Sequence, residues 1–204
     1  MTCLTVAGLA FAVVPAQAAP GDAIAEGSAG AVTIGAVTVE PIAECSTEGT
    51  PSREARDVVV PNVVTLSTGR STCTVDALGE IAKTTVTGQM FRFDALRRYG
   101  GPRIRIASYV SRCQTSLSGS SSTIQFSGLT GVATPSHLPA NHVVTIPGGP
   151  NGRPMATVTF NEVVTPSTPD GSITVNLMHI RMFPRGGPTT GDAYVGTVHC
   201  APLY

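Results

Sequence analysis

The chain of 204 residues has a formal net charge of zero, since 13 basic residues balance 13 acidic ones, and charged residues make up only 13% of it. It therefore lacks the basic field that holds nucleic acid and the acidic field that attracts cations, so no nucleic-acid partner is expected. Hydrophobic residues make up 42% of the chain but aromatic residues only 5%, and this length suits one domain with an aliphatic core.

The N-terminal residues predict a signal peptide. Residues 4–16 form an uncharged apolar run, too short for a membrane helix, which needs about 20 residues. The run ends in Ala16-Gln17-Ala18, the small-x-small pattern that signal peptidase cleaves. A basic segment before the run is missing, and the alternative is a buried N-terminal strand. We expect a signal peptide at 1–18 and a single exported domain at 19–204, without a transmembrane span.

Short runs rich in Val and Thr recur along the rest of the chain, separated by Gly, Pro, Ser and Asn, and no stretch keeps a helical period. Such runs favour β-strands. About ten short strands with turn signals between them predict an all-β domain, a loop-rich antiparallel β-sandwich or barrel. The expected strands cover residues 31–39, 58–66, 71–75, 83–95, 104–113, 122–126, 141–146, 155–163, 172–183 and 193–200.

Two connecting segments need separate interpretation. Residues 98–102, Arg-Tyr-Gly-Gly-Pro, are typical of a hairpin turn; the alternative is a short helical turn at 94–99. The serine-rich stretch 116–122 is interpreted as a flexible surface loop. A serine hydrolase needs G-x-S-x-G at a strand-to-helix turn, whereas Gly119-Ser120-Ser121-Ser122 lacks the closing glycine. We therefore expect no catalytic residue and no enzyme activity.

The four histidines do not form metal-binding pairs within one element, so neither a metal site nor another cofactor is expected. Strand alternation turns His199 outward, because its neighbours Val198 and Cys200 should face the core. Glu162 shares its parity with Phe160, which places it on the core side. His179 shares its parity with Leu177. We predict a Glu162–His179 hydrogen bond as a buried structural link, with a metal or catalytic role as the less favoured alternative.

Removal of residues 1–18 leaves Cys45, Cys73, Cys113 and Cys200. An even number of cysteines in an exported protein predicts two disulfides. No pair has the C-x-x-C spacing of a zinc site. Four cysteines allow three pairings, and strand alternation does not choose between them, since residues of parity equal to Cys113 mix apolar with polar side chains.

A glycan-binding module is the alternative function. Such modules commonly place exposed aromatic rings beside carboxylates and amides. The candidate contacts are Tyr99, Tyr109 and Tyr194, with Asp192 and Asn151 on nearby turns.

The second half of the chain contains several motifs in a distinctive order. They are the strand that ends at Cys113, a polar loop, and residues 122–129 (STIQFSGL), 141–148 (NHVVTIPG), 158–162 (VTFNE), 174–180 (TVNLMHI) and 191–200 (GDAYVGTVHC). This order resembles the actinobacterial choice-of-anchor P family of exported surface proteins, over residues 105–200 and more loosely over 27–104. The resemblance implies a β-rich wall or extracellular protein.

The family's pattern brackets this region with one cysteine at each end. The resemblance therefore implies the pair Cys113–Cys200, which leaves Cys45–Cys73 as a local clasp across the edge of the first sheet. Taken together, we expect a non-catalytic secreted or cell-wall-associated protein with a structural or interaction role. Its expected partners are cell-wall glycan or another surface protein. The alternatives are a carbohydrate- or cell-wall-binding module and, third, a secreted hydrolase.

Overall fold

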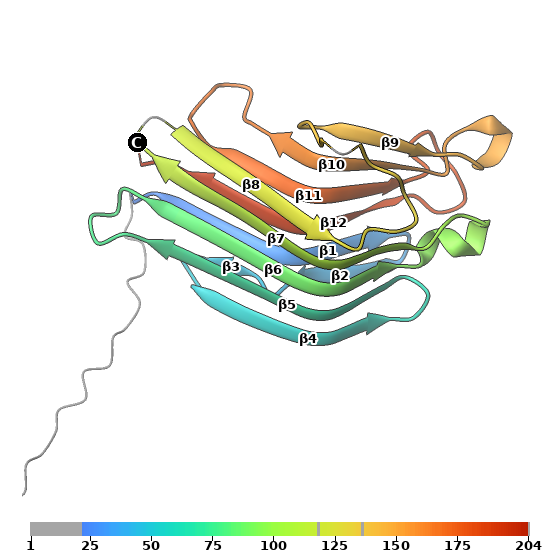
Figure 1. Ribbon diagram of the computed structural model, residues 1–204, viewed down its shortest axis with the longest axis horizontal. Helices are drawn as coiled ribbons and strands as arrows, with labels where there is room; N and C mark the ends of the chain where they lie inside the picture. Colours follow the sequence, from blue (N-terminus) through green and yellow to red (C-terminus); the bar gives the residue numbers. More distant parts are fainter. Residues whose placement is uncertain (1–21, 118, 136, 204) are drawn as a thin grey trace, which may run out of the picture.

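The computed structural model describes residues 22–117, 119–135 and 137–203, so the predicted signal peptide lies outside the described residues. Two antiparallel sheets pack face to face (Figure 1), which confirms the prediction of an all-β sandwich. Within the described residues, no helix has the length and apolar character needed to cross a membrane.

The five-stranded sheet has the order β4-β5-β6-β7-β8, and the seven-stranded sheet has the order β2-β1-β12-β11-β10-β9, with β3 also paired to β1. The strands of the five-stranded sheet are β4 (Ser52–Val60), β5 (Val64–Val75), β6 (Ala82–Phe93), β7 (Ile104–Ser116) and β8 (Gly119–Ser127). Those of the seven-stranded sheet are β1 (Ile24–Ile34), β2 (Val37–Ile42), β3 (Cys45–Ser46), β9 (His142–Ile146), β10 (Ala156–Val164), β11 (Ile173–Met182) and β12 (Gly191–Ala201). Two short 3₁₀ helices, η1 (Ala95–Tyr99) and η2 (Pro150–Gly152), lie in connections.

Two of the expected strands are hairpins in the structure. The stretch 31–39 contains the turn between β1 and β2, where Gly35 has φ +57°, and the stretch 58–66 contains the turn between β4 and β5, where Asn62 has φ +62°. Glycine and asparagine tolerate this left-handed backbone. Both turns were missed because only Gly35 in the first stretch, and Pro61-Asn62 in the second, interrupt an otherwise β-rich run.

Two connecting segments also differ from the first expectation. Residues Ala95–Tyr99 form η1, and Gly100 closes it in the left-handed region with φ +78°, so the helical alternative is correct and the hairpin turn at 98–102 is wrong. The serine-rich stretch is mostly strand: β7 and β8 pair from Cys113↔Ser122 to Ser116↔Gly119. Serine is a weak strand former alone, but here the ladder to β7 provides the pairing.

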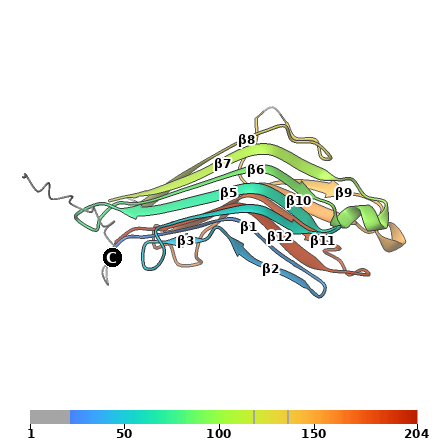
Figure 2. The same ribbon diagram turned by 90° about the horizontal axis from the view of Figure 1, so that it is seen from below.

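Most of the long strands, β1, β4–β7 and β10–β12, are bent, and the bends line up across both sheets (Figure 2). At the bends the register between neighbouring strands is interrupted. In each sheet the skipped residues form a row that runs across the strands. Alternation shifts by one at this row: in β6 the buried side is at Val86 before the row and at Phe91 and Phe93 after it, while Met90 between them is exposed. The rows consist of Ala29, Asn161, Leu177 and Gly196 in the seven-stranded sheet and of Asp57, Ser67, Met90 and Ala107 in the five-stranded sheet.

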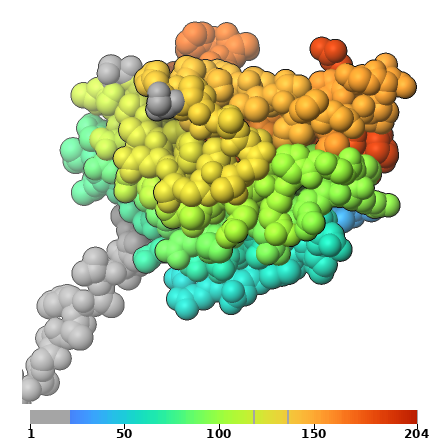
Figure 3. All heavy atoms as spheres, turned by 45° about the vertical axis from the view of Figure 1, so that its right-hand side comes forward, coloured from blue at the N-terminus to red at the C-terminus, as the bar shows by residue number. Residues whose placement is uncertain are grey.

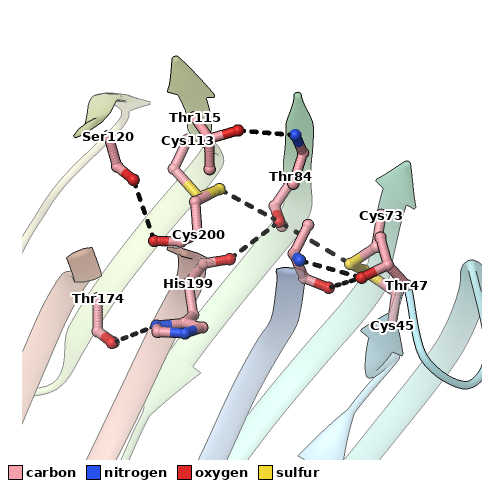
Figure 4. The surroundings of a disulfide bond; sticks show 12 residues. Cys45, Thr47, Cys73, Thr84, Cys113, Thr115, Ser120, Thr174, His199 and Cys200 are labelled. Atoms are coloured by element: carbon pink, nitrogen blue, oxygen red, sulfur yellow. Dashed lines mark hydrogen bonds between the residues drawn. A yellow bond between two sulfur atoms is a disulfide. The ribbon is translucent and has the colours of Figure 1, made fainter. Parts of the chain in front are cut away.

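Both disulfides join the two sheets (Figure 4). Cys45 of β3 is bonded to Cys73 of β5, and Cys113 of β7 is bonded to Cys200 of β12. The pairing agrees with the expectation, but the description of Cys45–Cys73 as a local clasp across a sheet edge is wrong. Its cysteines come from opposite sheets and both are buried.

Thr84 of β6 lies between the two bridges. It pairs with Cys73 on one side and Cys113 on the other in the five-stranded sheet. Its hydroxyl lies 3.9 Å from the sulfur of Cys73 and 3.8 Å from that of Cys200, and it donates to the carbonyl of His199 at 3.3 Å (Figure 4). The two disulfides and the Thr84 hydrogen bond therefore link the two sheets at the same end of the sandwich.

Candidate functional site

The outer face of the seven-stranded sheet carries a buried polar network centred on His179 of β11. Its Nδ1 lies 2.8 Å from Oε1 of Glu162 on β10, and its Nε2 lies 2.7 Å from Oδ1 of Asp192 on β12. The His179 side chain is only 6% exposed. The predicted Glu162–His179 hydrogen bond is confirmed, and the imidazole is held between carboxylates from both neighbouring strands.

The charges of these groups support one another. Burial of the His179 ring opposes its protonation, but the hydrogen bonds to Glu162 and Asp192 outweigh burial and raise its pKa. Burial likewise opposes ionisation of Glu162 and Asp192, yet hydrogen bonds from His179 and from Asn176 or Arg181 hold the pKa of each carboxyl below its ordinary value. The network thus favours an imidazolium between two carboxylates.

Further side chains extend the network along the sheet. The Asn176 amide donates to Oε2 of Glu162 at 2.7 Å, and the Thr197 hydroxyl donates to Oδ1 of Asn176 at 2.7 Å. The Arg181 Nε donates to Asp192 at 3.0 Å. The network therefore spans β10, β11 and β12 and fixes the side chains that it contains.

Tyr194 of β12 stacks on the His179 ring, with the ring centroids 4.3 Å apart and 21° between the planes. Burial, with the nearby charges of Asp192 and Glu162, raises the pKa of its hydroxyl. An imidazolium over a tyrosine ring gains from the negative face of the ring. One face of Tyr194 is thus fixed against His179.

A groove of about 430 Å³ runs beside this network, over β1, β11 and β12. Its polar lining consists of a tyrosine ring, two carboxylates, an amide, three hydroxyls and an imidazole, from Tyr194, Glu26, Glu44, Asn176, Ser28, Thr174, Thr197 and His199. The hydroxyl of Thr174 lies 2.9 Å from Nδ1 of His199 (Figure 4). Hydrogen-bonding groups beside a fixed ring can bind a ligand that has hydroxyls and an apolar face.

The bends explain how these residues reach the outer face. Beyond the bend at Asn161, which has φ +49°, Glu162 pairs with Asn176 and points outward, while Phe160 before the bend is buried. His179 points outward because the bend at Leu177 shifts alternation in β11 as well. The expectation that Glu162 faces the core is therefore wrong. The equal parity of His179 and Leu177 is also misleading, because the two side chains do not lie on the same face of the sheet. His199 faces outward as expected, since it lines the groove.

The five candidate glycan contacts do not converge. Tyr194 lines the groove and Asp192 belongs to the network beside it. Tyr109 is wrong as a surface contact: it is 1% exposed and its hydroxyl donates to the carbonyl of Ala29 inside the core. The sequence did not predict this burial, because the residues that alternate with Tyr109 along its strand are a mixture of apolar and polar side chains. Tyr99 lies on η1 and donates to Thr189 at 2.6 Å, and Asn151 lies on η2, so neither reaches the groove.

The network does not offer metal ligands or a free base. No group of three or more His, Cys, Asp or Glu side chains in the described ranges is arranged to hold a metal ion. Both nitrogens of His179 are hydrogen-bonded, which leaves neither of them free to take a proton from a substrate. The sequence did not indicate that Asp192 and Tyr194 would meet His179, because strand pairing decides which residues become neighbours.

No family model, curated protein or solved structure matches the chain.

Proposed function

We propose that this chain is an exported, non-catalytic interaction protein that binds cell-wall glycan in the groove beside Tyr194. The proposal rests above all on the ring of Tyr194, which is stacked on His179 and lines a groove that also contains hydrogen-bonding side chains. A sugar ring presents hydroxyls at its edge and C–H groups on its face. A fixed tyrosine beside carboxylates and amides complements both surfaces.

The absence of catalysis is part of the proposal. Glycoside hydrolysis needs a carboxylic acid and a second carboxylate on opposite sides of the scissile bond. Within the network, Glu162 is hydrogen-bonded through both oxygens to His179 and Asn176, and its pKa is lowered, which is unsuited to a general acid. To the carboxylates that line the groove, Glu26 and Glu44, the proposal assigns hydrogen bonds to sugar hydroxyls. The network therefore supports a recognition role, with another surface protein as the alternative partner.

Export is supported by the two disulfides, because such bonds persist in oxidising compartments. With the apolar run at 4–16 and the site Ala16-Gln17-Ala18, the proposal expects an extracellular chain that begins at Ala19. The choice-of-anchor P resemblance agrees with a place at the cell surface. N-terminal sequencing of the protein from culture supernatant tests this, and a chain that kept residues upstream of Gln17 would contradict it.

A pull-down on isolated cell walls tests the binding function. The wild-type protein is expected to bind and to be released by soluble wall glycan, while Tyr194→Ala loses at least tenfold in affinity. Tyr194→Phe keeps the ring and should retain most of the binding. Asn151→Gly is the matched control, since it changes an exposed side chain outside the groove and suits φ +55°.

Three results would contradict the proposal. The first is wall binding that soluble glycan does not release, which would favour a protein partner. The second is equal binding by wild type and Tyr194→Ala, which would remove the groove from the interaction. The third is release of soluble sugar from the walls with time, which would indicate a hydrolase.

A further inference from the structure

A second cavity lies at the end of the sandwich opposite the disulfides. It has a volume of about 900 Å³ and is bordered by the β1–β2 turn, the β4–β5 turn, η1 and Thr189. Figure 2 shows the β1–β2 hairpin, in blue, projecting away from the other strands at this end, and Figure 3 shows the green residues around η1 above the cyan residues of β4. The cavity is separate from the groove beside Tyr194, with which it shares no residue.

The lining of this cavity is rich in arginine. Arg92, Arg97, Arg98 and Arg103 all border it, and Asp94 is its only acidic residue. We call it the arginine cleft. In a chain with 13 basic and 13 acidic residues, four cations against one carboxylate form a local excess of positive charge.

Asp94 does not neutralise the cleft. Its Oδ2 lies 2.7 Å from Nε of Arg92, and its Oδ1 lies 2.6 Å from Nε of Arg103. The single carboxylate is therefore shared by two guanidinium groups, and these two side chains remain 41% and 40% exposed. Asp94 thus orients Arg92 and Arg103. Nη2 of Arg92 also donates to the Thr65 hydroxyl at 3.0 Å, and both guanidinium groups stay partly exposed at the cleft.

Arg97 and Arg98 form no ion pair with any carboxylate of the described residues at these distances. The guanidinium of Arg98 lies 5.9 Å from the centre of the Tyr99 ring. That ring is fixed by an edge contact with Phe183, at 5.0 Å between centroids, and by its hydrogen bond to Thr189. Both cations are thus free to meet an anion at a wall of the cleft that is itself held in place.

Guanidinium groups bind the oxygens of carboxylate, phosphate and sulfate in pairs, and the fork of N–H donors suits such groups better than an ammonium. The walls include the apolar side chains of Ile34, Val63 and Met182, and apolar walls focus the field of the charges between them. A cavity of this volume has room for several monomer units. One small ion would leave most of it empty.

We propose that the arginine cleft binds a linear oligomer that carries repeated oxyanion groups. The shared chemistry is carboxylate or phosphate at intervals along a flexible chain. Single-stranded nucleic acid fits less well, because its recognition depends on aromatic rings on which bases stack. The one tyrosine of the cleft already contacts Phe183, Thr189 and Arg98.

The test measures binding of fluorescently labelled oligogalacturonate and polyphosphate to the full disulfide-bonded domain at two salt concentrations. At least one of the two should bind, and binding should weaken as salt rises. A neutral dextran oligomer has no charge for the cleft to bind, so any binding of it should not weaken as salt rises. The double variant Arg97→Ala/Arg98→Ala is expected to lose at least tenfold in affinity; both side chains are exposed, so the fold should persist.

The matched control is Arg53→Ala/Arg70→Ala, which removes two exposed arginines of β4 and β5 outside the cleft. It should bind like wild type. An equal loss in both double variants would mean that overall charge, and not the cleft, attracts the anion. Absence of binding to both oligomers, or tighter binding of a single-stranded oligonucleotide, would overturn the proposal. Whichever oligomer binds better identifies the source of the oxyanion as carboxylate or phosphate.

Discussion

The hydroxyl of Tyr109 donates a hydrogen bond of 2.6 Å to the carbonyl of Ala29, from one sheet to the other through the core. Ala29 belongs to the transverse row at which the β1–β12 ladder is interrupted, since the pairs run from Ser28↔Thr197 to Gly30↔Val195. Gly88 gives the Tyr109 ring its space, because a Cβ there would lie 2.1 Å from Cζ of the ring. The bend and the buried tyrosine are thus parts of one arrangement.

Tyr109→Phe is expected to lower the free energy of unfolding by about 1–3 kcal/mol, because the carbonyl of Ala29 loses its partner in the core. Urea denaturation measures the change. Tyr99→Phe is the matched control, since its hydroxyl bonds Thr189 at a half-exposed position, and it should cost less. Equal costs for the two variants would mean that the Tyr109 hydroxyl has no special role at the bend.

Gly88→Ala should destabilise the protein by about 1–3 kcal/mol or more, because the added methyl group displaces the Tyr109 ring in a packed core. Thermal unfolding measures the loss. Gly49→Ala, where the nearest side-chain atom lies 4.0 Å from the new Cβ, should change stability by no more than about 0.5 kcal/mol. An unchanged melting temperature in Gly88→Ala would contradict the close packing of Tyr109.

Stability should depend on pH through His179. Its pKa is raised from the ordinary value of 6.5, so its contribution is complete below 6.5 and is lost as pH rises through the folded-state pKa. The pKa values of Glu162 and Asp192 are lowered, so these carboxylates act at low pH. Their contribution to stability is present above the ordinary carboxyl pKa range, and it is lost as pH falls through the folded-state pKa values. Stability should therefore be highest between these limits.

Urea denaturation from pH 5 to pH 9 tests this dependence, and NMR titration of the His179 ring gives its pKa directly. In His179→Gln the decline above pH 6.5 should become smaller. A His179 titration midpoint below 6.5 would show that burial outweighs its two hydrogen bonds, and the predicted decline would then be absent.

The two disulfides should both matter to stability. The chain-entropy estimate is about 3–4 kcal/mol for the bridge that spans 28 residues and about 4–5 kcal/mol for the one that spans 87. Either Cys45→Ala/Cys73→Ala or Cys113→Ala/Cys200→Ala thus removes much of a typical stability of about 5–15 kcal/mol. Non-reducing peptide mapping checks the pairing, and denaturation of each double variant checks the cost. A negligible cost for the shorter bridge would mean that β3 is not an effective link between the sheets.

Much of the fold could be predicted from the sequence, because alternation in segments such as Arg103-Ile104-Arg105-Ile106 is a local property of the chain. The bends could not be predicted. Counting back from Cys113 in steps of two gives both buried and exposed residues, because the bend at Ala107 interrupts the count. Tyr109 and Ser111, on the same side of the bend as Cys113, are buried, whereas Arg105, on the other side, is exposed. A shift of alternation inside a strand shows in sequence only as a weakened pattern.

The candidate site could be predicted only in pieces. The Glu162–His179 contact was expected, but the side of the sheet on which it lies depends on the bends at Asn161 and Leu177. Asp192 and Tyr194 join it through the register β11–β12, which the sequence does not specify. The arginine cleft was not predicted. The net charge of the whole chain is zero, and the arginines of the cleft meet the β1–β2 and β4–β5 turns only in the folded protein.

The position of the disulfides also determines how the domain responds to mechanical force. Ile24 and Ala201, near the first and last residues of the described chain, are paired neighbours at the disulfide end of the sandwich, and Cys200 adjoins Ala201. A pull on both ends would therefore begin to peel β1 from β12 and would reach the Cys113–Cys200 bond almost at once. The residues between the bonded cysteines could not lengthen until that bond was reduced, although each released residue would otherwise add roughly 3.3–3.6 Å. While both bonds are intact, only the segments outside the two bonded loops can lengthen, so the reach of the stretched domain depends on the redox state of its surroundings.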